Sequence, residues 1–325
     1  MQFTTFNQLP LYTDDIFMRH LDIITQKDAI VIHNPQEAIV VSPVLLKSRK
    51  SLCEHIAFIR ENDIKKAIVV AENIQFISEC PTLEYLWVLP AIGSNNFDYS
   101  PIYELPNIKW LRCDTTTGWD EEQVASVDYS RFQEVSRLSI HGYKGHNNVA
   151  LAQNVVSLIF DFGYPNSNDL VGVLPIAKLR NLAVCQAPIK SLAGIEMSRK
   201  LRRLELSNNR KLSDISSLIS LKENLACLEI DTCGKISDFS VLDTLTNLEY
   251  LTLKGSNTLP DLSFLMNMPK LRYFHLTMNV ADGDLSLCER LPYARIKNRK
   301  HFSHKDKDLQ KCYSDPDEAF SFNEM

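Results

Sequence analysis

Three side chains that can take part in nucleophilic catalysis fall at corresponding places in a recurring sequence pattern. His141, Asp161 and Cys185 each directly follow two apolar residues separated by one other residue, as in Leu182-Ala-Val184. On one face, an imidazole can activate a thiol while a carboxylate orients the imidazole. The competing interpretation is chance alignment along a polar column, because no local motif marks Cys185 as a nucleophile.

Other motifs for catalysis or ligand binding are lacking. The chain has ten glycines and no Walker-type phrase, so no phosphate-cradling loop is predicted. The pairs His141/His146 and His301/His304 have no Cys or carboxylate partners at a recognised zinc spacing. We therefore expect no metal and no cofactor, and we interpret these histidines as loop or surface residues.

A repeated apolar pattern organises most of the sequence. Leu201-Arg-Arg-Leu204-Glu-Leu206 has apolar residues at relative positions 1, 4 and 6, and the same spacing recurs from Leu225, Leu248 and Leu271. Looser copies begin at Ile64, Leu83, Ile108, Val135, Val155, Leu179 and Leu291. A period of about 20 to 25 residues is typical of a solenoid of stacked strand-plus-connection units, whose core lies between neighbouring repeats.

The connections between the predicted strands share a second phrase. In Leu212-Ser-Asp214-Ile215-Ser, and again around Asp238 and Asp261, an Asp precedes an apolar residue and a Ser. This arrangement predicts a capped turn leading into a short helical or 3-10 segment. Position 9, which we expect to hydrogen-bond the turning backbone, is occupied by Asn209, Cys233, Ser256 and Asn279.

These phrases resemble those of leucine-rich repeat proteins. Ile236-Ser-Asp-Phe-Ser-Val-Leu242 and Leu245-Thr-Asn-Leu-Glu-Tyr-Leu-Thr-Leu253 are similar to the internalin-like class, with about 22 residues per repeat. The resemblance is specific over 179–285, looser over 64–178 and does not cover 1–60. It implies an α/β solenoid with a curved parallel sheet on its concave face and short helical, 3-10 or irregular convex segments. Members of this class are mostly protein-binding scaffolds without catalysis, which is the role the resemblance implies.

Three regions are predicted: an N-terminal capping region at 1–63, about eleven repeats at 64–298 (irregular over 64–178, regular over 179–285), and a C-terminal cap and polar tail at 299–325. Within the first region, the runs Ala29-Ile-Val-Ile32 and Ala38-Ile-Val-Val41 predict two strands, and Leu52 to Ile59 predicts a short amphipathic helix.

Composition narrows the class of partner and the compartment. The 325 residues carry a net charge of −5, which argues against nucleic acid as a partner. No signal peptide and no apolar run of about 18 residues is evident, so we expect no membrane contact. The eight cysteines show no close pairing pattern. We therefore expect reduced thiols and a cytoplasmic protein.

Positions 3, 5 and 7 of each repeat are predicted to point away from the core, onto the concave face, where they would be exposed. Three groups of candidate binding residues result: a tyrosine column with basic neighbours (Tyr250, Tyr273, Tyr293, His275, Arg295), an acidic strip (Glu205, Glu229, Asp231), and an aromatic patch (Tyr85, Trp87, Trp110, Arg112). Tyr, Trp and Arg carry much of the binding energy at protein interfaces. The competing interpretations are aromatic stacking for stability and a solvated charged face.

The sequence thus favours a non-catalytic scaffold that clamps a folded protein, with the acidic strip suiting a partner of basic surface. Its concrete form would be neutralisation of a cognate protein by an immunity or inhibitor protein. The alternatives are an enzyme-recruiting adaptor or cryptic Cys/His enzyme built on Cys185, and a self-associating structural solenoid. The oligomeric state is left open.

Overall fold

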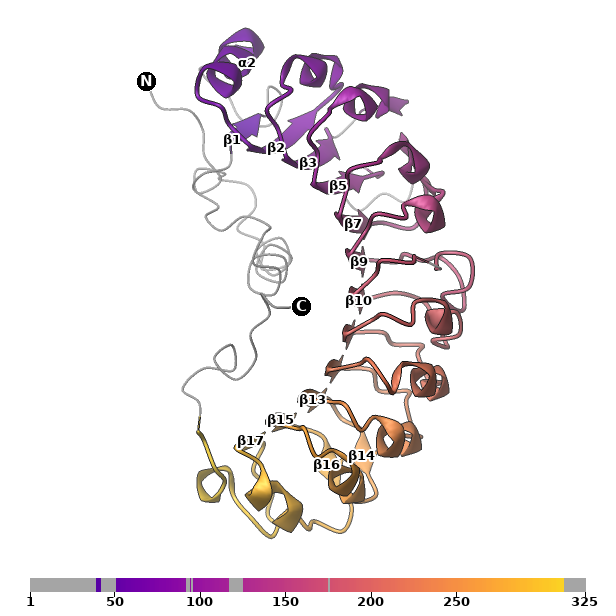
Figure 1. The fold of residues 1–325 in the computed structure, drawn as a ribbon, viewed down its shortest axis with the longest axis vertical. Helices are drawn as coiled ribbons and strands as arrows, with labels where there is room; N and C mark the ends of the chain where they lie inside the picture. Colours follow the sequence, from indigo (N-terminus) through magenta and orange to yellow (C-terminus); the bar gives the residue numbers. More distant parts are fainter. Residues whose placement is uncertain are drawn as a thin grey trace. The chain divides into compact units, whose positions relative to one another are not determined.

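The computed structural model describes residues 39–41, 51–91, 94, 96–116, 125–174 and 176–312. They belong to two compact units, a first unit within residues 1–155 and a second unit within residues 156–325. Both are built from short strands joined by connections that contain 3-10 helices (Figure 1). The strand predicted at Ala29–Ile32 and the tail after residue 312 lie outside the described residues.

Five strands of the first unit form a parallel sheet. Their order is β1 (Ile39–Val41), β2 (Lys66–Ala71), β3 (Tyr85–Pro90), β5 (Trp110–Asp114) and β7 (Arg137–His141). The position-4 residues are in register, because Leu111 pairs with Leu86 on one side and with Leu138 on the other. All three are buried. The spacing rule therefore identified the core column even in these irregular repeats.

The connections of the first unit have a sheet of their own. Strands β4 (Phe97–Asp98), β6 (Ala125–Asp128) and β8 (His146–Asn147) pair in parallel as a narrow second sheet. The 3-10 helices are η3 (Gln75–Glu79), η4 (Ser100–Glu104), η5 (Tyr129–Arg131) and η6 (Val149–Leu151).

The helix predicted before the first repeat is present as α2 (Leu52–Glu61). It begins with a capping box, in which the Ser51 hydroxyl accepts a hydrogen bond from the backbone of Glu54, and the Glu54 carboxylate accepts one from the backbone of Ser51. Strand β1, which precedes the helix, pairs in parallel with β2. The described part of the N-terminal region therefore adds a strand to the repeat sheet.

Seven strands of the second unit form a parallel sheet, in the order β9 (Ser157–Asp161), β10 (Asn181–Cys185), β11 (Arg203–Ser207), β12 (Cys227–Asp231), β13 (Tyr250–Lys254), β15 (Tyr273–Leu276) and β17 (Tyr293–Ile296). Two shorter strands, β14 (Thr258–Leu259) and β16 (Asn279–Val280), pair separately. The 3-10 helices are η7 (Ile195–Met197), η8 (Ser216–Leu221), η9 (Ser240–Thr244), η10 (Ser263–Asn267), η11 (Ser286–Arg290) and η12 (Asp306–Asp308).

The core of the second unit lies between these strands and the 3-10 helices. Leu204, Leu228 and Leu251, at position 4 of successive repeats, are paired in register and fully buried. Within this unit the strands lie on the concave side and the 3-10 helices on the convex side (Figure 1). The predicted solenoid is confirmed.

The connections follow the predicted turn chemistry. A carboxylate oxygen of Asp214, Asp238 and Asp261 accepts a hydrogen bond from the backbone N–H of the serine two residues later, at 2.9, 2.8 and 2.7 Å respectively. Each turn leads into a 3-10 helix, namely η8, η9 and η10. These bonds satisfy backbone donors that the start of a short helix would leave without partners.

Position 9 behaves as predicted in two repeats and differs in the next. The buried Asn209 donates to the carbonyl oxygen of Val184 at 2.7 Å, and the thiol of Cys233 contacts the carbonyl oxygen of Leu206 at 3.6 Å. Ser256 was the wrong choice, because it is exposed. Its neighbour Asn257 is buried and donates to the carbonyl oxygen of Ile236 at 2.8 Å.

The turn of that repeat accounts for the buried residue being Asn257 and not Ser256. Gly255 has a φ of +134°, a conformation that L side chains rarely adopt, and the chain passes through it before the buried asparagine. The next predicted asparagine, Asn279, is only half-buried.

A C-terminal segment covers the last strand of the second unit. The backbone of Ala294 donates to the carbonyl oxygen of Gln310, and that of Cys312 donates to the carbonyl oxygen of Pro292. Phe302 and Leu309 are buried. The open edge of β17 is thereby paired. Among the described residues, no helix combines the length and the apolar character that crossing a membrane requires.

Candidate functional site

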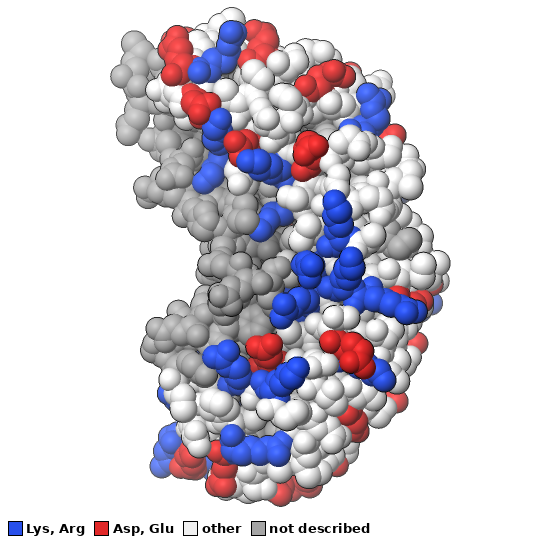
Figure 2. Space-filling model, in the orientation of Figure 1, with Lys and Arg blue, Asp and Glu red and all other residues white. Residues whose placement is uncertain are grey.

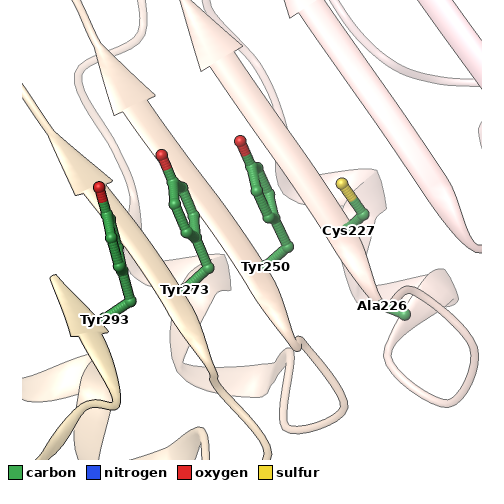
Figure 3. Close-up of a cluster of buried hydrophobic side chains, with 5 residues drawn as sticks. All are labelled: Ala226, Cys227, Tyr250, Tyr273 and Tyr293. Carbon is green, nitrogen blue, oxygen red and sulfur yellow. The ribbon is translucent and has the colours of Figure 1, made fainter. Parts of the chain in front are cut away.

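We call the concave side of the seven-stranded sheet in the second unit the sheet face. The tyrosine column lies on this face. Tyr250, Tyr273 and Tyr293 start successive strands and pair in register. The rings of Tyr250 and Tyr273 have centroids 4.3 Å apart and an interplanar angle of 4°, and those of Tyr273 and Tyr293 are 4.8 Å apart at 11°. Figure 3 shows the three hydroxyl groups pointing the same way.

The column was expected to be exposed, and this expectation is corrected. Tyr250, Tyr273 and Tyr293 are only 9%, 2% and 8% accessible. Neighbouring parallel strands lie about 4.8 Å apart, so identical rings in register cover one another's faces. Burial raises the pKa of Tyr273 to about 12 and raises that of Tyr250 further, so these phenols stay protonated at neutral pH.

Both ends of the stack have a partner. Cys227 is paired in register with Tyr250 and is buried beside it (Figure 3). At the other end the ammonium of Lys311 lies 5.3 Å from the centroid of the Tyr293 ring and also contacts the carbonyl oxygen of Ala294. No sequence signal points to Lys311, because it lies outside the repeats, where the apolar spacing does not apply.

The acidic strip is largely paired with basic residues of the same face. The carboxylate of Glu229 lies 3.3 Å from Lys254, that of Asp231 lies 3.7 Å from Lys254, and Glu205 lies 4.0 Å from Arg203. Glu205 and Glu229 are buried. The expectation of an exposed strip is therefore corrected for Glu205 and Glu229. Arg203 lies two residues before Glu205 on β11, and Lys254 on β13 is paired with Asp231 on the neighbouring strand β12.

The sheet face also has accessible residues. Arg295 is exposed, while Asp231, Lys254 and His275 are partly accessible. Burial, together with the nearby Lys254 and Arg295, lowers the pKa of His275 to about 4. His275 is therefore neutral at physiological pH and can both donate and accept hydrogen bonds.

The predicted aromatic patch belongs to the first unit and is also buried. Trp87 pairs with Arg112, and Tyr85 pairs with Trp110, as the repeat positions require. The guanidinium carbon of Arg112 lies 4.3 Å from the centroid of the Trp87 ring, and its Nε lies 2.8 Å from Asp114. Trp87, Trp110 and Arg112 are buried, whereas Tyr85 is partly accessible. The expectation that this patch is exposed is corrected for those three residues.

The three residues considered for nucleophilic catalysis are not gathered within one unit. Cys185 and Asp161 pair in register on β10 and β9 of the second unit, whereas His141 ends β7 of the first unit. The thiol of Cys185 is buried and accepts a hydrogen bond from Ser207 at 3.1 Å. This arrangement is that of a structural cysteine beside a hydroxyl.

His146 and His301, which were interpreted as loop or surface residues, have structural partners, and for His146 in β8 that interpretation is corrected. His146 is buried, with its ring nitrogens 2.9 Å from the Tyr129 hydroxyl and 2.9 Å from the His141 carbonyl oxygen, and burial lowers its pKa to about 4. A ring nitrogen of His301 lies 3.0 Å from the Val280 carbonyl oxygen. Across the described ranges, no three His, Cys, Asp or Glu side chains are grouped to hold a metal ion.

Known proteins share this fold at low sequence identity. An internalin from Listeria monocytogenes superposes with a TM-score of 0.50 and 19% identity, over 73% of this chain and 69% of that one. A leucine-rich repeat protein from Leptospira interrogans gives a TM-score of 0.51 and 16% identity, over 80% and 71%. No family model and no curated protein matches the sequence. The parallel sheet, the buried repeat positions and these neighbours together show that the chain has the leucine-rich repeat fold of the internalins.

Proposed function

We propose that the protein is a non-catalytic scaffold whose second unit binds a folded protein through the sheet face. The observation that carries the proposal is the tyrosine stack, flanked by the accessible residues Arg295 and His275. A buried stack holds its neighbours in place, so little side-chain entropy is lost when they contact a partner. Arginine and tyrosine are also the residues most often found at the energetic centre of protein interfaces.

The ion pairs of the sheet face bear on the charge that we expect for the partner's surface. Glu205, Glu229 and Asp231 are engaged with Arg203 and Lys254, so they offer little net negative charge. We therefore no longer expect the partner to have a basic surface. Neutralisation of a cognate enzyme, as by an immunity or inhibitor protein, stays a prediction from the sequence; it adds the expectation that the bound enzyme loses activity.

The test is capture of a protein from the organism that makes this chain, with matched variants as bait. Arg295→Glu reverses an exposed charge on the sheet face, and Lys235→Glu makes the same change at an exposed position in a connection. We expect wild type and Lys235→Glu to capture the same protein and Arg295→Glu to lose it. Equal capture by all three baits would exclude the sheet face as the binding surface.

Substitution of the tyrosines by alanine is a poor test of binding, because it removes buried rings. Tyr273→Phe keeps the stack and deletes only the hydroxyl. Captured protein that is retained by Tyr273→Phe but lost by Arg295→Glu would assign the contact to the accessible residues and the support to the stack.

A further inference from the structure

One flank of the second unit is strongly basic where β10 and β11 begin. Arg180 directly precedes β10 and Arg202 directly precedes β11, while Lys178, Arg199 and Lys200 lie in the turns before these strands. Arg202 is partly accessible and the other four are exposed. Figure 2 shows Lys and Arg side chains gathered over this region.

The two arginines are hydrogen-bonded neighbours on adjacent chain segments, and we call such a pair a rung. The N–H of Arg202 donates to the carbonyl oxygen of Arg180 at 2.8 Å. Backbones at this position are about 4.8 Å apart, and like charges directly opposite each other on adjacent strands are destabilising. The fold alone gives no reason for two arginines here.

At two other places the corresponding pair of residues carries opposite charges. In the first unit the N–H of Lys109 donates to the carbonyl oxygen of Glu84, and their side chains form an ion pair of 2.6 Å. In the second unit the N–H of Arg272 donates to the carbonyl oxygen of Glu249, so opposite charges again follow each other. The Arg180–Arg202 pair instead brings two like charges together.

Four of the five basic side chains of this flank are not paired with a carboxylate of a described residue. In the part of the chain that the structure describes, Arg180, Arg199, Lys200 and Arg202 form no ion pair. The whole chain has a net charge of −5, so this local excess runs against the overall charge. Unfavourable arrangements of charge that do not stabilise the fold are expected at functional surfaces.

We propose that this basic flank binds an acidic segment of a partner protein. Guanidinium groups bind carboxylates through paired, charge-assisted hydrogen bonds, which suits Asp and Glu side chains. The proposal rests on the proposed function only in taking the partner to be a protein, and it concerns a surface separate from the sheet face.

The extent of the patch favours a short acidic segment over a nucleic acid. In the next two repeats the same flank presents Glu223, in the turn before β12, and Glu249, directly before β13. A long polyanion lying along the flank would meet these carboxylates. A segment confined to the starts of β10 and β11 would not.

The test measures binding of a fluorescent oligoglutamate peptide to the full chain by anisotropy at low salt. The variant Arg180→Glu/Arg202→Glu reverses the flank, and Lys211→Glu/Lys235→Glu makes the same change in charge at exposed positions in the connections. We expect the first variant to weaken peptide binding about tenfold or more and the control to bind like wild type. An oligothymidine strand and vesicles containing phosphatidylserine should bind more weakly than the peptide.

Three results would overturn the proposal: no peptide binding by wild type, equal weakening in both variants, or tighter binding of the oligonucleotide or the vesicles. The single variant Arg202→Glu separates loss of binding from loss of folding, because it places opposite charges at positions 180 and 202. It should melt at or above the wild-type temperature while binding peptide more weakly. Arg295→Glu should keep peptide binding, so failure of the sheet-face proposal would be seen separately.

Discussion

The ring of Tyr250 lies parallel to that of Tyr273 at a centroid distance of 4.3 Å, and the two residues are paired on adjacent strands. Tyr273 has a second ring, that of Tyr293, on its other face. The middle tyrosine therefore has a ring stacked on each of its faces, and it is the least accessible of the three.

Removal of that ring should destabilise the second unit. Tyr273→Ala leaves a cavity between two rings, and we expect a loss of about 3 to 5 kcal/mol in the free energy of unfolding, measured by urea titration. Tyr273→Phe should stay within about 1 kcal/mol of wild type, because it keeps both ring contacts. A Tyr273→Ala variant as stable as wild type would show that the stack does not support the fold.

The two residues of the buried ion pair in the first unit should be coupled in their effect on stability. The side chains of Arg112 and Asp114 are 3% and 10% accessible and lie 2.8 Å apart. Asp114→Ala leaves a buried guanidinium without its carboxylate, which should cost about 3 to 5 kcal/mol. Arg112→Met/Asp114→Ala should cost less than the sum of the two single variants in the same denaturation assay. Additive effects would mean that the pair is not coupled.

The turn aspartates should make stability depend on acidity. Hydrogen bonds from the serine two residues later lower the pKa values of Asp214, Asp238 and Asp261 below their usual value. A group with a lowered pKa in the folded state stabilises above its unfolded pKa, and this contribution is lost as pH falls through the folded value. The melting temperature of wild type should therefore drop more steeply between about pH 5 and pH 2.5 than that of the triple Asp→Asn variant. Parallel curves would contradict this account.

Thiol reactivity should separate the structural cysteines from the accessible ones. Cys53 and Cys312 are exposed, and the other six, Cys185 among them, are buried. Burial raises the pKa of Cys80 and Cys233 to about 11 and that of Cys288 to about 12, which further disfavours their thiolates. Alkylation near neutral pH should modify Cys53 and Cys312 quickly and Cys185 slowly, as mapped by mass spectrometry. Rapid modification of Cys185 would revive the cysteine-enzyme alternative.

The fold is predictable from the sequence where one spacing of apolar residues determines the structure. Apolar residues at positions 1, 4 and 6 identified the core column, and Leu204, Leu228 and Leu251 are paired and buried as that spacing requires. The prediction of position 9 failed by one residue at Ser256, because no apolar residue fixes the register of a turn that passes through Gly255.

The candidate site was harder to predict than the fold. Strand alternation gives the face on which Tyr273 or Trp87 lies, but it does not reveal how far neighbours on that face cover it. The pairing of Glu205 with Arg203, and the contact of Lys311 with Tyr293, depend on side-chain conformation and on a segment outside the repeats. The like-charged rung of Arg180 and Arg202 is visible in the sequence once the position before each strand is compared between repeats.

The most direct test of the central claim, binding through the sheet face, is the dissociation constant of the captured protein for four forms of the chain. We predict that wild type, Tyr273→Phe and Lys235→Glu bind alike, while Arg295→Glu binds at least about tenfold more weakly. If Arg295→Glu, folded as judged by its melting curve, binds as tightly as wild type, the sheet face is not the binding surface.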